Sequence, residues 1–434
     1  MSSLTLIGAH RAVSELLENR PESWDVVRFK GLFQRLDRRN GDLAHEMLSL
    51  RSTGEVVARA EMGGRQEPDE ANLPKYLIAE VNDLVVNPMW LIGGGIGVSR
   101  RAGAVSPDYR VYRSRGALLP RFVHHLLRSQ PYLDQYLLYT RAQTTFDRRV
   151  QQSDLDNLPL PVPPMEEQRA IADYLDHETA RIDTLIEEQQ RLIEMLQERR
   201  FALRANVALH GTAPTEEVES PLPWAEKLPA EWRVVPLTSV AKLASGHTPS
   251  RSREDWWRDC YIPWVSLHDV GTMRSVKYLH DTAQRISDAG IANSSARLLP
   301  ARTVVLSRDA TVGRTAIMGV PMATSQHFAA WVCGPDLDPE YLWVLFGDAM
   351  QPFFDSFQNG STIRTIGMGD LKAFRIPLPP LDEQRRIVEY LDEETAKIDS
   401  LIAETERFVQ LSRERRSVLI TAAVTGQIGV RGVA

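Results

Sequence analysis

PVPPMEEQRAIADYLDHETARIDTLI, residues 161–186, occurs a second time in the chain as PLPPLDEQRRIVEYLDEETAKIDSLI, residues 377–402. The two copies lie 216 residues apart, and 17 of their 26 aligned positions are identical. Identity at this level is too high for shared helix composition alone. The chain therefore contains an internal tandem repeat.

Each copy predicts a long α-helix that begins at its prolines. Proline suits the first turn of a helix, and acidic residues complement the positive end of the helix dipole there. Apolar residues then recur in steps of three, four or seven over about forty residues without Pro or Gly, which is typical of a coiled-coil seam. The expected helix-pairing residues are Ile171, Leu175, Ile182, Leu185, Leu192 and Leu196 in the first copy, and Ile387, Leu391, Ile398, Leu401, Phe408 and Leu419 in the second.

The nearest partner for each apolar stripe is the other copy. A single helix of roughly 60 Å with an exposed leucine stripe is a poor soluble element, because packing of that face supplies most helical stability. We therefore expect the two helices to pair as a rod. The alternative is two separate helices, each docked on its own globular domain, which explains the periodicity but not the length.

The repeat divides the 434 residues into five predicted segments. These are a first globular unit (1–160), a long helix (161–210), a proline-rich acidic linker (211–227), a second globular unit (228–376) and a second long helix (377–434). Both globular units carry the same landmarks in the same order: a Trp-containing strand, a glycine-containing strand region, a helical stretch (120–139 and 339–357) and a polar loop. Only the second unit has SGHTPSRSREDWW from Ser245 and IPWVSLHDV from Ile262.

Charge is distributed unevenly. The net charge of −6 by itself argues against a nucleic-acid-binding protein, but residues 84–150 contain ten arginines, no lysine and three acids. A local basic face can bind a polyanion, because screening limits the reach of exposed charge to about 10 Å.

Cys260 and Cys333 lie far apart, so neither a disulfide framework nor a zinc site is indicated. With no secretory signal and no long apolar run, we expect a soluble cytoplasmic protein.

The duplicated LPxPPxxEQxxIxxYLDxxTAxID helix, the order of the units and the SGHTPS and IPWVS stretches resemble the specificity subunit of type I restriction-modification systems. The resemblance implies an α+β fold in which two α/β target-recognition domains are separated by the two helices, paired as an antiparallel coiled coil with pseudo-two-fold symmetry. It also implies recognition of a bipartite site in double-stranded DNA with a non-specific gap. The implied partners are methyltransferase subunits, two in number, and restriction subunits. S-adenosylmethionine, ATP and Mg are expected on those partners, with no cofactor in this chain.

Loop residues that can contact DNA fall in both units, because arginine forks onto phosphate or guanine and hydroxyl groups bond phosphate. In the first unit we predict Arg100, Arg101, Arg110, Arg113 and Arg115, with Thr144, Thr145 and Arg148 in the polar loop. In the second we predict Thr248, Ser250, Arg251, Arg253, Trp257, Arg308, Thr311 and Arg314, with Ser361, Thr362 and Arg364. The alternatives are ordinary solvated charge for the arginines, and core packing for Trp256 and Trp257.

Two rival functions come from other classes. A protein-only coiled-coil adaptor leaves the arginine-rich loops unexplained. A self-contained adenine methyltransferase would use Asn87-Pro88-Met89-Trp90, which resembles the motif that holds a flipped base, but no glycine-rich cofactor turn precedes it. No other catalytic motif is present in the sequence, which favours a non-catalytic recognition subunit.

Overall fold

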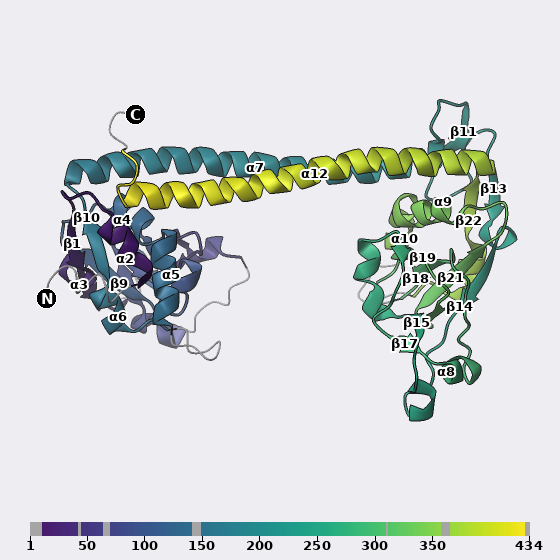
Figure 1. The fold of residues 1–434 in the computed structure, drawn as a ribbon, viewed down its shortest axis with the longest axis horizontal. Helices are drawn as coiled ribbons and strands as arrows, with labels where there is room; N and C mark the ends of the chain where they lie inside the picture. The colour runs from purple at the N-terminus through teal and green to yellow at the C-terminus, as the bar shows by residue number, and fades with distance from the viewer. Residues whose placement is uncertain are drawn as a thin grey trace. The chain divides into compact units, whose positions relative to one another are not determined.

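The computed structural model describes residues 11–41, 45–63, 70–140, 149–309, 311–356 and 365–429. The chain forms two compact units: Met1–Gln190 with Arg407–Ala434, and Arg191–Glu406. The two long helices are α7 (Met165–His210, 46 residues) and α12 (Leu381–Val424, 44 residues) (Figure 1). Each unit therefore contains half of each long helix, and the division into five segments stays a prediction.

The first unit is built around a four-stranded sheet of order β2-β9-β6-β7, formed by Phe33–Leu36, Arg110–Ser114, Leu84–Val86 and Ile96–Val98. Three antiparallel pairs surround it: β1 (Asp25–Arg28) with β10 (Pro159–Val162), β3 (Leu48–Leu50) with β4 (Val56–Ala58), and β5 (Leu77–Ala79) with β8 (Gly103–Val105). Its shorter helices are α2 (Arg11–Glu18), α3 (Phe29–Leu32), α4 (Pro120–Leu126), α5 (Gln130–Tyr139) and α6 (Gln152–Asn157).

The second unit is built around a five-stranded sheet of order β14-β21-β18-β19-β16, formed by Ala241–Ser245, Phe328–Cys333, Val304–Ser307, Thr315–Met318 and Tyr278–Leu279. A three-stranded sheet has the order β17 (Arg285–Ile286), β15 (Ile262–Val265), β20 (Ala323–Thr324), and β13 (Arg233–Pro236) pairs with β22 (Arg375–Leu378). Its shorter helices are α8 (Asp288–Ala292), α9 (Pro339–Val344), α10 (Gln351–Ser356) and α11 (Met368–Ala373).

A buried glutamine joins the start of each long helix to its own unit. Gln168 is 1% exposed; its Oε1 accepts from Leu119 N at 2.6 Å, and its Nε2 donates to Ala117 O and Pro163 O. Gln384 is 0% exposed and repeats the pattern with Asp338 N, Asp336 O and Pro379 O. Leaving such a buried amide unpaired costs about 1–3 kcal/mol, so the glutamine of each PPxxEQ motif fixes the helix entry.

The long helices run antiparallel inside each unit. In the first unit Arg416 of α12 forms an ion pair with Asp183 of α7 at 2.8 Å, and in the second Arg200 of α7 forms an ion pair with Asp399 of α12. Early residues of one helix thus meet late residues of the other, which confirms the predicted coiled coil. Each long helix also packs on a globular domain at its start, as the alternative expected. Ile171 and Leu175 are part of the first unit's core, and Ile387 and Leu391 are part of the second unit's core.

Burial corrects the predicted seam at three positions. Leu192, Leu401 and Phe408 are 37%, 51% and 43% exposed. On α12 the buried series continues from Ile398 to Val409, and Leu401 and Phe408 are offset by one residue, about 100° around the helix, from Ile402 and Val409. Leu401 and Phe408 are apolar and seven residues apart, and so are Ile402 and Val409. The sequence pattern therefore cannot tell which of the two pairs faces the partner helix. Ile182, which is buried, and Leu185, Leu196 and Leu419, which are partly buried, fit the predicted seam.

Three predicted segments differ in detail. The helical stretch 120–139 is broken between α4 and α5, where Ser129 Oγ donates to Leu126 O. The stretch 339–357 contains α9, a π-helical turn η8 (Leu345–Ala349) and α10. The predicted linker (211–227) contains strand β11 (Glu217–Glu219), and its hairpin partner β12 (Lys227–Pro229) begins at the last linker residue and continues into the predicted second unit. Leu222, Ala225 and Leu228 form a small buried cluster in this hairpin.

Candidate nucleic-acid interface

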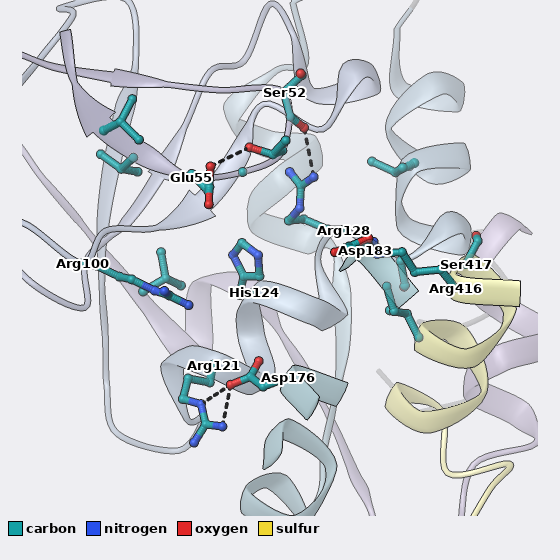
Figure 2. Close-up of a pocket in the computed structure, with 18 of the residues that line it drawn as sticks. Ser52, Glu55, Arg100, Arg121, His124, Arg128, Asp176, Asp183, Arg416 and Ser417 are labelled. Atoms are coloured by element: carbon teal, nitrogen blue, oxygen red, sulfur yellow. Dashed lines mark hydrogen bonds and ion pairs between the residues drawn. The ribbon is translucent and has the colours of Figure 1, made fainter. Parts of the chain in front are cut away.

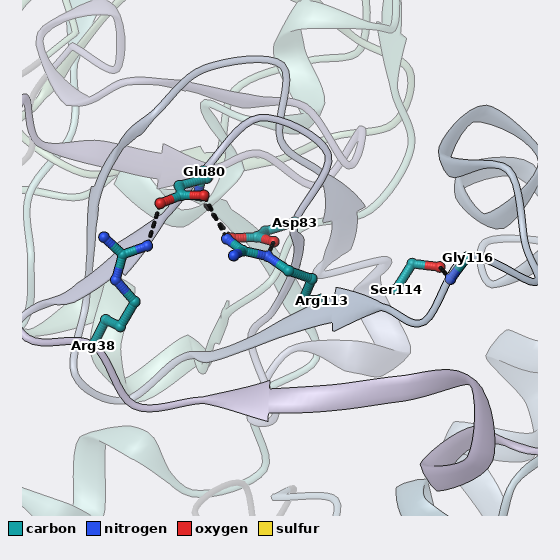
Figure 3. A network of polar contacts seen from close by, with 6 residues as sticks. All are labelled: Arg38, Glu80, Asp83, Arg113, Ser114 and Gly116. Carbon is teal, nitrogen blue, oxygen red and sulfur yellow. Dashed lines mark hydrogen bonds and ion pairs between the residues drawn. The ribbon is translucent and has the colours of Figure 1, made fainter.

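Arg113 is held in an ion-pair network on the first unit (Figure 3). It lies on strand β9 and bonds Asp83 at 2.9 Å and Glu80 at 2.6 Å, while Arg38 bonds the other oxygen of Glu80. The hydrogen bond from Arg38, with the charge of Arg113, lowers the pKa of Glu80. Arg113 is therefore paired with two carboxylates although its side chain is partly exposed, and its role as a DNA contact stays a prediction.

Arg110 is buried. Only 8% of it is exposed, and its Nη2 donates to Val150 O at 3.0 Å. Burial lowers the pKa of this guanidinium. Because β9 places the side chain inside the unit, Arg110 is withdrawn from the predicted DNA contacts.

Arg100, Arg101 and Arg115 remain accessible. Arg101 pairs with Glu61 at 2.7 Å, and both Arg100 and Arg115 are exposed. Among the residues that the structure describes, no ion pair involves Arg100 or Arg115, so these two keep an uncompensated positive charge. Both side chains are therefore available for the phosphate contacts that the sequence predicts for them, and that role stays a prediction.

Arg100 borders a groove of about 1020 Å³ in the first unit, between loops of the domain and the halves of α7 and α12 that belong to it (Figure 2). Arg128 donates from its guanidinium to Ser52 O and Ile96 O, and burial, with the charge of Arg416, lowers its pKa to about 10. Burial, followed by the charges of His125 and Arg128, lowers the pKa of His124 to about 3, so this ring is neutral at physiological pH.

Arginine and tryptophan side chains stack in the insert that only the second unit carries. Arg251 lies 3.9 Å above the ring of Trp257 and donates to Gln284, and Arg253 lies 5.0 Å above Trp256 while pairing with Asp255. Trp257 packs against a small core that includes Trp264, which fits the packing alternative. Ser250 accepts from Trp257 Nε1 at its carbonyl, leaving its hydroxyl to bond Ser252. The insert is thus a preformed surface with exposed guanidinium edges.

The remaining predicted residues of the second unit are placed differently. Arg308 Nε donates to Ile366 O at 3.0 Å, and Thr311 is partly buried. Arg314 lines a smaller groove of about 300 Å³, and burial lowers the pKa of its guanidinium. Thr144, Thr145, Arg148, Ser361, Thr362 and Arg364 lie outside the described residues. Their role as DNA contacts stays a prediction.

The Asn-Pro-Met-Trp stretch forms a turn between β6 and β7. Asn87 Oδ1 accepts from Met89 N at 3.1 Å, and the glycines after it lead through the short η3 (Leu91–Gly93) into a strand. A Cβ on Gly93 would lie 2.3 Å from the side chain of Trp90, so this glycine makes room for the tryptophan. The glycines here support a hairpin turn rather than a loop that opens a helix, as a dinucleotide fingerprint would.

Sequence reasoning missed three residues beside Thr248. Thr248 donates to Gln326, which lies next to His327, and His327 bonds Asp309 at 2.7 Å. The sequence offers one signal for them: Gln326 and His327 are polar and stand between the largely apolar stretches 316–323 and 328–333.

In the described part of the chain, no three His, Cys, Asp or Glu side chains are grouped so that they could hold a metal ion. Cys260 and Cys333 are free, and burial raises the pKa of Cys333 to about 12. No described helix is long and apolar enough to cross a membrane.

Comparison with known proteins places this arrangement in a family. The family model of the type I restriction modification DNA specificity domain matches residues 125–195 and 229–406, more than half of the chain. The specificity subunit of the type I restriction enzyme MjaIX of Methanocaldococcus jannaschii is 28% identical over 166 residues, which is 38% of either chain. That of EcoR124I/EcoR124II of Escherichia coli is 26% identical over 191 residues, 43% of this chain and 46% of the relative. The matched stretches thus span less than half the length of these relatives.

Two solved structures share the fold. A chain from a study of complex assembly and conformational transition of the type I R-M system has a TM-score of 0.74 at 21% identity, covering 94% of this chain and 100% of that one. The HsdS subunit of Thermoanaerobacter tengcongensis has a TM-score of 0.58 at 21% identity, with coverage of 94% and 98%. The family model matches more than half of the chain, and the same buried glutamine holds the start of each long helix. This chain therefore belongs to the type I restriction modification DNA specificity domain family.

Proposed function

We propose that this chain is the sequence-specific DNA-binding subunit of a type I restriction-modification complex, acting in the cytoplasm as a non-catalytic component. It reads a bipartite site in double-stranded DNA, one half with each unit. The methyltransferase and restriction subunits that dock on it carry S-adenosylmethionine, ATP and Mg.

One observation supports the proposal above the others: the two units share the same helix entry but carry different loops on their surfaces. Both units use the same glutamine at the helix entry, while the loops on that frame differ. The first unit presents Arg100 and Arg115, and the second presents the Arg251–Trp257 stack. A frame kept while the surface changes is expected of two modules that read different sequences.

Docking of protein partners is supported by α12. In the first unit this helix leaves Phe408, Leu411 and Val418 exposed by 43%, 53% and 67%. Exposed apolar side chains on one helix are typical of a protein-binding surface. The same surface suits the rival function, a protein-only adaptor, so DNA binding decides between the two.

The test is to coexpress the chain with its methyltransferase partner and map methylated positions across a genome. The proposed function requires methylation at one bipartite sequence, which is absent without this chain. Adding about four residues near Gln189, one helical turn, should lengthen the gap by roughly 6 Å without changing the specified bases. Partner binding without any sequence-specific methylation or DNA binding would favour the adaptor.

A further inference from the structure

The turn between β20 and β21 of the second unit holds one exposed glutamine on a fixed backbone. Ser325 N donates to Val265 O at 2.8 Å, His247 N to Thr324 O at 3.1 Å, and Arg308 N to His327 O at 2.9 Å. Thr324, Ser325 and Phe328 are buried, whereas Gln326 is exposed. The backbone that carries Gln326 is therefore tied to three other segments.

Side chains on both sides orient the amide of Gln326. Thr248 Oγ1 donates to its Oε1 at 2.7 Å, and its Nε2 lies 3.4 Å from His327 Nε2. On the other side of the ring, His327 Nδ1 lies 2.8 Å and 2.7 Å from the two carboxylate oxygens of Asp309. In the tautomer whose Nδ1–H donates to the carboxylate, Nε2 is an acceptor, which fits the amide nitrogen of Gln326 on that side.

Gly246 explains how Thr248 comes within hydrogen-bond distance of Gln326. A Cβ at this position would lie 1.6 Å from Thr324 O, so only glycine lets the SGHTP segment pass directly over the end of β20. The insert that distinguishes the second unit is thereby joined to the turn. The residue that orients Gln326 belongs to this insert.

The oriented amide keeps one donor and one acceptor free toward solvent. Nε2 has a second hydrogen, and Oε1 has a second lone pair. A donor beside an acceptor in one plane matches the major-groove edge of adenine, where N7 accepts and the N6 amino group donates. We propose that Gln326 reads an adenine in the half-site of the second unit, with Thr248, His327 and Asp309 as its positioning residues.

The first unit differs at the corresponding turn. Its residues 104–109 read AVSPDY where the second unit has ATSQHF at 323–328, so Pro107 and Asp108 replace Gln326 and His327. Neither replacement offers an amide edge. The inference rests on the proposed function and assigns this adenine to one half of the site only.

The experiment uses the full chain assembled with its methyltransferase, carrying Gln326→Ala, with methylated sites mapped genome-wide. Discrimination at one A·T pair of one half-site should fall about tenfold or more, because a bidentate pair supplies about 1–3 kcal/mol of discrimination. The other half-site and the gap stay unchanged. Thr248→Val, which removes the orienting hydroxyl, should relax the same pair by a smaller factor.

A second measurement tests the atom that is read. Replacing that adenine with 7-deazaadenine removes the N7 acceptor, so it should weaken binding of the wild-type complex but not of the Gln326→Ala complex. Gln410→Ala, an exposed glutamine of α12, is the matched control and should change neither readout. Thermal unfolding of each variant separates a folding defect from a change in recognition.

The outcomes are distinct. Full discrimination by Gln326→Ala, a uniform loss of affinity for all sequences, or relaxation at a G·C pair would each overturn the assignment of Gln326 to adenine. These results leave the proposed function intact, since the wild-type complex still methylates one bipartite site. Absence of any site-specific methylation by the wild-type complex would instead refute the proposed function.

Discussion

At the scale of single residues, glutamines that are identical in the two units are buried and hold the helix entries, whereas exposed loop residues differ between the units. Gln168 and Gln384 are buried and make the same three hydrogen bonds in the two units. The arginines of the first unit divide in another way: Arg110 and Arg113 bond within the protein, while Arg100 and Arg115 are exposed. Residue type alone therefore does not identify a DNA contact.

Reversing the charge of Arg100 should weaken DNA binding of the assembled methyltransferase for all sequences. A lost phosphate contact releases about one counterion fewer, so Arg100→Glu should reduce the slope of log affinity against log salt by about 1. Titrations at several salt concentrations measure this slope. Arg11→Glu, at the exposed start of α2, is the control for net charge. An unchanged slope and affinity would remove Arg100 from the interface.

His124 should make the first unit sensitive to mild acid. Its pKa is about 3 in the folded protein, below the ordinary value of about 6.5 in an unfolded chain. Between these values the unfolded chain binds the additional proton, so stability is lost as the pH falls below about 6.5. The drop in thermal midpoint from pH 7.5 to pH 5 should therefore be smaller in His124→Gln. His177→Gln, on a side chain that is 78% exposed, should behave as wild type; an equal drop in all three proteins would contradict the prediction.

At the scale of elements, the long helices are paired by repeated ion pairs as well as by apolar contacts. Asp183 and Asp399 are 216 residues apart in the repeat, and so are Arg200 and Arg416. In the first unit Arg416 Nη2 donates to Asp183 Oδ2 at 3.1 Å, and Arg416 Nε lies 2.8 Å from Asp183 Oδ1. Each helix thus supplies the acid in one unit and the base in the other.

Reversing one charge of the first pair should lower stability, and reversing both should restore it. Arg416→Asp places two carboxylates together and should cost about 1 kcal/mol, because both side chains are partly exposed; this is roughly 2–4 °C in thermal midpoint. The double variant Asp183→Arg with Arg416→Asp should recover most of the loss. Arg415→Asp, at the neighbouring exposed position, controls for charge. Additive losses in the double variant would mean that the pair does not stabilise the helices.

At the scale of the whole molecule, the repeat allows one half to replace the other. The first unit's core includes Ala423 and Val424 of α12, and the second unit's core includes Val207 and Ala208 of α7. These residues correspond at the offset of 216. A second copy of α7 therefore carries suitable side chains for the place of α12 in the first unit.

A fragment that ends at Gly211, where the positive φ of 79° closes α7, should form a symmetric antiparallel dimer. Asp183 of one copy would pair with Arg200 of the other, and the apolar seam would be covered. Light scattering should report the dimer. Methylation mapping with the partner should find a split palindrome built from the first half-site alone. A stable monomeric fragment would show that each helix needs only its own domain.

The sequence by itself determined the repeat, the two long helices, the residues where they begin and the family resemblance, because these depend on local periodicity and on 17 identities in 26 aligned residues, which need no coordinates. Tertiary structure alone decided which of two adjacent apolar series faces the partner helix, since Leu401 and Ile402 differ only by rotation about one axis. It also decided which polar side chains meet. Thr248 and Gln326 are 78 residues apart, and only the close passage at Gly246 brings them together. Arg110 is buried and Arg113 is paired with carboxylates, because burial and ion pairing are set by strand neighbours distant in the sequence, which a run of arginines does not encode.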